Sequence, residues 1–168
     1  METISYFGFG ANAHPHMIEA IIGRAPHGEA SILPGYALAI QSLDDIPDTV
    51  LLSAPAPLSP RSILSRAWGS SFRSYTLQRD DMRDVWGTMW QVTKAERELI
   101  SKWELVPYGW SSELFADALF RDGSHCPVTT EWIFDQPIER VVEGRCYPRF
   151  IVPEADLLRV AREMREAN

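Results

Sequence analysis

The chain has 168 residues, a length typical of one domain, and with 45% hydrophobic and 23% charged residues it has the composition of an ordinary soluble globular protein. Its net charge of −7 argues against a nucleic-acid partner, because phosphate binding needs clustered lysine and arginine. No apolar run is long enough to span a bilayer, and METISYFGFG does not resemble a signal peptide. We therefore expect one cytoplasmic domain over residues 1–168, with no membrane partner and with Cys126 and Cys146 reduced.

The first predicted elements are a strand, a turn, a helix and a second strand. Thr3 to Gly8 mixes β-formers with aromatic residues and ends at glycine, which predicts a short buried strand. Pro15 suits the first turn of the helix that follows, and Gly23 would end it. The segment from Glu29 to Gln41 predicts a strand that is interrupted by a bulge or turn at Pro34-Gly35.

Residues 42–71 form a long irregular excursion rich in proline and serine. Within it, Val50 to Ala54 could pair as a strand, and Arg61 to Gly69 could form a short helix. A connection of this length is often functional, for example as a lid over a site. An insertion without any catalytic part is the alternative, and the sequence does not choose between the two.

Two further strands and the clearest helix of the chain come next. Ser74 to Gln78 and Asp84 to Val92 are predicted to form an antiparallel hairpin around the charged segment RDDMR. Thr93 and Glu96 have the spacing of a capping box, in which each side chain bonds the free backbone N–H of the other. The apolar stripe of this helix is predicted from Ala95, Leu99, Ile100 and Trp103.

The last elements are a hairpin and a helix. Trp110 to Phe120 and Pro127 to Phe134 alternate like paired strands around the turn signal Asp122-Gly123. The residues after Pro153 predict an amphipathic helix. Because strands dominate and do not alternate with helices, we predict an α+β fold with a mixed, mostly antiparallel, barrel-like sheet and a few peripheral helices.

Several familiar kinds of site lack their motifs. The chain has no G-x-S-x-G elbow, P-loop, H-E-x-x-H or C-x-x-C, and GFGAN lacks the third glycine of a dinucleotide fingerprint. His14-Pro15-His16 suggests a metal ligand pair, but no third ligand follows at a recognisable spacing. We therefore predict neither a metal nor a cofactor.

Two segments could carry chemistry. The glycine turn Phe9 to Asn12 could merely reverse the chain, or it could present backbone N–H groups to a carboxylate or an oxyanion. Glu104 follows the capped helix beside Trp103 and near Tyr108 and Trp110. Poor solvation among aromatic rings would raise its pKa into the range useful for proton transfer, whereas the alternative is a solvated surface glutamate.

Together these segments resemble the γ-glutamylcyclotransferase-like superfamily, which includes the AIG2-like proteins. In that family a Y-G-S-[NL] type loop follows the first strand, and a V-x-G-x strand leads into a helix that ends in a catalytic glutamate. Here Phe9-Gly10-Ala11-Asn12 resembles the loop, Val85 to Trp90 resembles the strand, and Leu99 to Glu104 resembles the L-D-x-x-E ending. Looser similarity covers most of the chain except the excursion at 42–71.

The resemblance implies cyclisation of a γ-glutamyl amide to 5-oxoproline and a free amine, with Glu104 as general acid and base and without a cofactor. The substrate, a small γ-glutamyl compound, would contact Phe9, Gly10, Ala11, Asn12, Tyr108 and Trp110. Phe9 replaces the family's usual tyrosine and Ala11 its serine or threonine, so the loop lacks two hydroxyls. A non-catalytic module that binds a small metabolite in the same pocket, and an enzyme acting on another N-acyl amine, are the alternatives. The sequence identifies neither the amine nor the oligomeric state.

Overall fold

The computed structural model describes residues 3–167. Its strands are β1 (Thr3–Gly8), β2 (Gly28–Ser42), β3 (Arg73–Thr93), β4 (Ser112–Phe120), β5 (His125–Trp132) and β6 (Arg140–Val141). Its α-helices are α1 (Pro15–Ile22), α2 (Pro60–Trp68), α3 (Lys94–Trp103) and α4 (Glu154–Glu166). Short 3-10 turns are η1 (Gly10–Ala13), η2 (Leu43–Asp45) and η3 (Val106–Tyr108).

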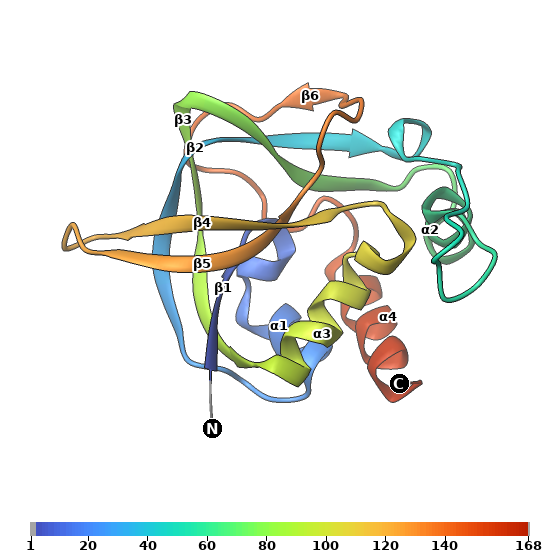
Figure 1. The fold of residues 1–168 in the computed structure, drawn as a ribbon, viewed down its shortest axis with the longest axis horizontal. Helices are drawn as coiled ribbons and strands as arrows, with labels where there is room; N and C mark the ends of the chain where they lie inside the picture. The colour runs from blue at the N-terminus through green and yellow to red at the C-terminus, as the bar shows by residue number, and fades with distance from the viewer. Residues whose placement is uncertain (1–2, 168) are drawn as a thin grey trace.

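Five of these strands close into a barrel (Figure 1). Their order is β3-β1-β5-β4-β2, and β2 pairs again with β3, which closes the barrel. The short strand β6 pairs with β2 at Ala39 and Ile40. The β1–β5 pair is parallel and the other pairs are antiparallel. Helices α1, α3 and α4 lie together beside the barrel, while α2 lies apart from them at the end of the excursion. The predicted α+β fold with a mixed, mostly antiparallel, barrel-like sheet is confirmed.

The early elements agree with their predictions. β1 and α1 have the predicted positions, and Gly23 ends α1 in the left-handed conformation that glycine adopts without steric cost. The register of β2 against β3 shifts between Pro34 and Tyr36, so the predicted interruption is a bulge within one strand. The later hairpin is also confirmed, because β4 pairs with β5 around Asp122-Gly123.

The hairpin predicted around RDDMR is wrong, because β3 is one strand of 21 residues. β2 continues past both of its halves, pairing Tyr36 with Arg79 and Pro34 with Asp84. The residues 80–83 lie opposite Gly35 alone and bulge out of the ladder. The polar turn signal therefore marks a bulge, because a long common partner strand keeps both halves in line.

Helix α3 has the predicted capping box, in which Thr93 Oγ1 accepts from the Glu96 N–H and the Glu96 carboxylate accepts from the Thr93 N–H. Its buried face agrees with the predicted stripe in part, because Leu99 and Trp103 pack against the core. Ile100 is buried as expected, but Ala95 is exposed and the charged residue Arg97 is buried. The helix thus directs an arginine toward the barrel, which the hydrophobic pattern alone could not indicate.

The excursion is folded, with α2 as its predicted helix but with no strand at residues 50–54. Arg61 fixes its course by donating to the carbonyl oxygens of Ile46 and Asp44, at 2.8 and 2.9 Å. Ser59 caps α2 and donates to Asp48 at 2.6 Å. None of the helices within residues 3–167 has the length and apolar character needed to cross a membrane.

Candidate active site

The loop after β1 is shaped by close backbone contacts. A Cβ on Gly8 would lie 2.3 Å from the carbonyl oxygen of Asn12, and Gly10 has a φ of +55° with Tyr75 packed against it. Glycine is required at both positions, at Gly8 by space and at Gly10 by backbone conformation. The Asn12 carbonyl also accepts from Nε1 of Trp90 at 2.8 Å. The turn therefore reverses the chain as one of the two interpretations predicted, and its contacts with Gly8 and Trp90 hold the backbone of Asn12 in place.

Two of the three backbone N–H groups in the loop already have partners. The Gly10 N–H donates to the Tyr147 hydroxyl at 3.3 Å, and the Asn12 N–H donates to the Phe9 carbonyl at 3.1 Å. Within the described residues, the Ala11 N–H donates no hydrogen bond, so this donor could still bind a ligand. The loop thus offers fewer backbone donors than the sequence alone would allow, while Tyr147 places a hydroxyl beside it.

Glu104 lies where α3 ends and the chain turns. Its N–H donates to the carbonyl of Ile100 at 2.9 Å, and its own carbonyl accepts from Ser111 Oγ at 2.8 Å. The next residue, Leu105, has a φ of +51°, a conformation that costs energy in any residue with a side chain. This strained turn holds the backbone of Glu104 from both sides.

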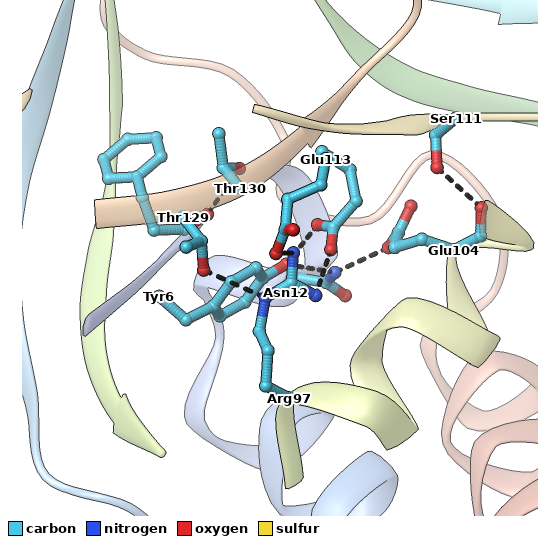
Figure 2. A network of polar contacts seen from close by, with 10 residues as sticks. Tyr6, Asn12, Arg97, Glu104, Ser111, Glu113, Thr129 and Thr130 are labelled. Carbon is cyan, nitrogen blue, oxygen red and sulfur yellow. Dashed lines mark hydrogen bonds and ion pairs between the residues drawn. The ribbon is translucent and has the colours of Figure 1, made fainter. Parts of the chain in front are cut away.

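Figure 2 shows how the loop and Glu104 meet. Asn12 Nδ2 donates to Glu104 Oε1 at 2.6 Å and to the Tyr6 hydroxyl at 3.0 Å. The Tyr6 hydroxyl donates in turn to Glu131 Oε2 at 3.1 Å. The two segments singled out in the sequence are thus joined directly, through one amide group.

A buried ion pair lies behind this chain. Arg97 Nη1 is 2.5 Å from Glu131 Oε1, and both side chains are almost fully buried. Arg97 also pairs with the half-exposed Glu113 at 3.2 Å and donates to Thr129 Oγ1 at 2.9 Å. Sequence reasoning missed Tyr6, Arg97 and Glu131, which lie on β1, α3 and β5. No local pattern marks them, because Arg97 and Glu131 become partners only when the barrel closes.

These surroundings change the pKa of Glu104. Burial of its carboxyl group, and secondly the negative charge of Glu131, raise the pKa to about 8, while the Asn12 hydrogen bond and the Arg97 charge oppose the rise. Glu104 as a whole is only half-buried, but its carboxyl group lies against the buried side chain of Asn12, and the burial of that group raises the pKa. Burial likewise raises the pKa of Tyr6 well above its usual range, so Tyr6 stays protonated and can donate to Glu131.

Glu104 faces a cavity of about 580 Å³. All residues predicted for the site line it: Phe9, Gly10, Ala11, Asn12, Glu104, Tyr108 and Trp110. Trp110 is held by a hydrogen bond from its Nε1 to Gln41 at 2.7 Å, so it contributes a fixed aromatic surface. A cavity of this size, lined mostly by apolar residues with fewer polar ones, is typical of small-molecule sites.

No family model matches the sequence, and no curated protein matches it. Among solved structures, a gamma-glutamyl cyclotransferase matches with a TM-score of 0.59 and 14% identity, over 82% of this chain and 70% of that one. This is the γ-glutamyl cyclotransferase fold. An uncharacterized protein from Homo sapiens has a TM-score of 0.58 at 13% identity, over 82% and 70% of the two chains. A protein from Arabidopsis thaliana has a TM-score of 0.53 at 15% identity, over 80% and 71%. The resemblance seen in the sequence is thereby confirmed for the fold.

Within the γ-glutamyl cyclotransferase fold of this chain, Arg149 is a cation that the sequence analysis did not select. It lines the same cavity, and its Nη1 donates to the Trp86 carbonyl at 3.1 Å and to the Tyr147 hydroxyl. That hydroxyl is also the partner of the Gly10 N–H. A positive charge thus lies next to the loop. No local motif in the segment CYPRF marks it, because only the fold brings residues 10 and 149 together.

The structure adds a third potential ligand to His14 and His16. Glu154, at the start of α4, brings a carboxylate into the group, and one ligand atom from each residue lies within 4.8 Å of the others. This partner is far away in sequence, so the local motif could not show it. Three ligands could hold a metal ion but are fewer than the four of a structural zinc site. The expectation of a metal-free site stays a prediction.

Proposed function

We propose that the protein is a γ-glutamylcyclotransferase-type enzyme that converts a γ-glutamyl amide into 5-oxoproline and a free amine. The observation that carries this proposal is the 2.6 Å contact between Asn12 and Glu104 inside the cavity. It joins the loop after the first strand to a carboxyl group whose pKa is raised to about 8, close to the value that favours proton transfer near neutral pH. The fold match to a gamma-glutamyl cyclotransferase supports it.

The reaction needs no nucleophile from the protein. The substrate's α-amine attacks its own γ-carbonyl carbon, a five-membered ring forms, and the bond from that carbon to the leaving nitrogen breaks. Glu104 removes a proton from the α-ammonium so that the nitrogen lone pair is free to attack. It then delivers this proton to the departing nitrogen, so that the amine leaves as a neutral molecule and Glu104 is ionised again. The attacking nitrogen loses a second proton to solvent as the lactam forms, and the ring nitrogen keeps one hydrogen. Asn12 keeps the carboxyl group in place throughout.

The substrate's α-carboxylate requires positive partners in the same cavity. Arg149 and the N–H of Ala11 are suited to this task, because Tyr147 holds Arg149 next to the loop and Ala11 has an amide donor to offer. This contact would orient the α-amine toward Glu104. It also replaces the hydroxyl contacts that the sequence lost at Phe9 and Ala11.

A non-catalytic binding module is the second candidate, and the absence of hydroxyls at Phe9 and Ala11 is the observation that favours it. Incubation with a panel of γ-glutamyl amides, followed by mass detection of 5-oxoproline and of the amine, separates the candidates. The enzyme is expected to release both products in equal amounts from at least one amide. Binding without release would contradict the enzyme, and amine release without 5-oxoproline would indicate action on a different acyl group.

The pH dependence of this reaction should respond to Glu131. Because Glu104 acts first as a base, kcat/KM is expected to rise with pH until Glu104 is ionised, near its pKa of about 8. Glu131→Gln removes a negative charge that raises this pKa, so the rising limb should move to lower pH. The exposed residue Glu143 supplies the control, and Glu143→Gln should leave the limb unmoved. If the rising part of the pH profile of folded Glu131→Gln stays in place or moves to higher pH, the charge of Glu131 does not raise the pKa of Glu104.

A further inference from the structure

One part of the cavity is much more apolar than a γ-glutamyl group requires. The helix α2 contributes Ile63, Ala67 and Trp68, and α4 contributes Leu157, Val160 and Met164. Every residue that these two helices add to the lining is apolar. The charged lining residues come from elsewhere. Arg73 is paired with Glu139 at 2.7 Å, Arg149 lies beside the loop, and Lys102 and Glu104 come from the end of α3.

The volume of the cavity also exceeds what a short polar ligand needs. About 580 Å³ lies in the range of about 300–1,000 Å³ that holds drug-sized ligands. The γ-glutamyl group occupies the region of Asn12, Glu104 and Arg149 if the proposed function is correct. The remaining space, bounded by α2 and α4, is then left for the amine that departs.

The apolar wall is a fixed part of the fold. Arg61, in the first turn of α2, is bonded to two carbonyl oxygens of the preceding segment, and Trp68 stacks on Phe72 with ring centroids 6.0 Å apart. On the same excursion, Leu51 packs against Gly109, directly before the cavity residue Trp110. The excursion at 42–71 therefore forms one wall of the cavity, and whether this wall binds a substrate stays a prediction.

We infer that the leaving amine carries an uncharged apolar group, aliphatic or aromatic, that binds against α2 and α4. This inference rests on the proposed function and adds the substrate class to it. Burying an apolar chain against such a wall removes hydrocarbon from water, whereas a carboxylate or ammonium there would lose its hydration and gain no counter-charge from the lining residues of α2 or α4. The cavity should therefore discriminate against amino acids and diamines as leaving groups.

Three matched substrates test this preference. γ-Glutamyl ethylamide has a short amine, γ-glutamyl isopentylamide extends it by three carbons, and γ-glutamylleucine adds one carboxylate to the isopentyl skeleton. Since each buried methylene is worth about fourfold in affinity, kcat/KM for the isopentylamide should exceed that for the ethylamide by roughly tenfold to a hundredfold. It should also exceed the value for γ-glutamylleucine. Equal values, or preference for γ-glutamylleucine, would overturn the inference.

Charged substitutions in the wall provide the matched variants. Ala67→Asp changes an exposed residue of α2 that lines the cavity, and Val160→Asp changes a half-buried lining residue of α4. Each is expected to reduce the preference for the isopentylamide over the ethylamide by about tenfold or more. Leu52→Asp is the control, because Leu52 lies on the same excursion, is fully exposed and does not line the cavity. An unchanged preference in both wall variants would contradict the proposed position of the amine.

A binding measurement separates this inference from the proposed function. Glutaryl isopentylamide and glutaryl ethylamide lack the α-amine and cannot cyclise, so their affinities can be compared by calorimetry without turnover. Tighter binding of the isopentyl compound, together with no 5-oxoproline from any amide, would support the apolar subsite and refute the enzyme. Release of 5-oxoproline from all amides without an isopentyl preference would support the enzyme and refute the subsite.

Discussion

Glu104→Gln is expected to lower the rate of 5-oxoproline formation by roughly two to four orders of magnitude, the usual contribution of a general acid or base. Glutamine keeps the oxygen that accepts from Asn12 at 2.6 Å, so the loop and the end of α3 should stay in place. It removes only the ability to take up and deliver a proton. The rate is measured as 5-oxoproline released per unit time at saturating substrate, and affinity by calorimetry with the glutaryl amide.

The stability of this variant gives an independent check. Burial raises the pKa of Glu104 from 4.5 to about 8, so ionisation is harder in the folded protein than in the unfolded chain. The wild type should therefore lose stability as pH rises from about 4.5 through about 8, and Glu104→Gln should lack this loss. Glu98→Gln, an exposed glutamate on the same helix, is the matched control for both measurements. Turnover in Glu104→Gln that equals the wild type would remove Glu104 from the mechanism.

The central features of the site could be predicted because they depend on local signals. The Thr93–Glu96 capping box fixes where α3 begins, and its length then places Glu104 at its end. The glycines of the first loop mark a tight turn beside β1. Since these signals act within a few residues, they marked both halves of the Asn12–Glu104 contact as candidates, and the family resemblance then implied a role for each.

The remaining parts depend on pairings between distant segments, which no local pattern encodes. The residues RDDMR predict a turn from local chemistry, but β3 is one strand because its partner β2 pairs with both of its halves. Arg97 and Glu131 are separated by 34 residues, and only closure of the barrel brings them into contact. Arg149 reaches the loop in the same way, through Tyr147. Long-range topology thus adds the charges that adjust the site, while local chemistry places its central carboxyl group.

Arg97→Met is expected to lower the free energy of unfolding by about 3–5 kcal/mol, because it leaves the Glu131 carboxylate buried without its counter-charge. Within residues 3–167, the donor that remains to that carboxylate is the Tyr6 hydroxyl. Urea unfolding, followed by circular dichroism at neutral pH, measures the change. Arg159→Met is the control, because the Arg159–Glu163 pair is exposed and its loss should cost at most about 1 kcal/mol.

The double variant Arg97→Met/Glu131→Gln decides whether an unpaired buried charge causes the loss of stability in Arg97→Met. Glutamine is neutral and can still accept from Tyr6, so most of the lost stability should return. If the double variant is no more stable than Arg97→Met, the loss comes from missing packing of the long arginine side chain instead. If Arg97→Met costs no more than Arg159→Met, the buried pair does not hold α3 to β5. In that case the position of Glu104 would depend on its own contacts with Ile100, Ser111 and Asn12.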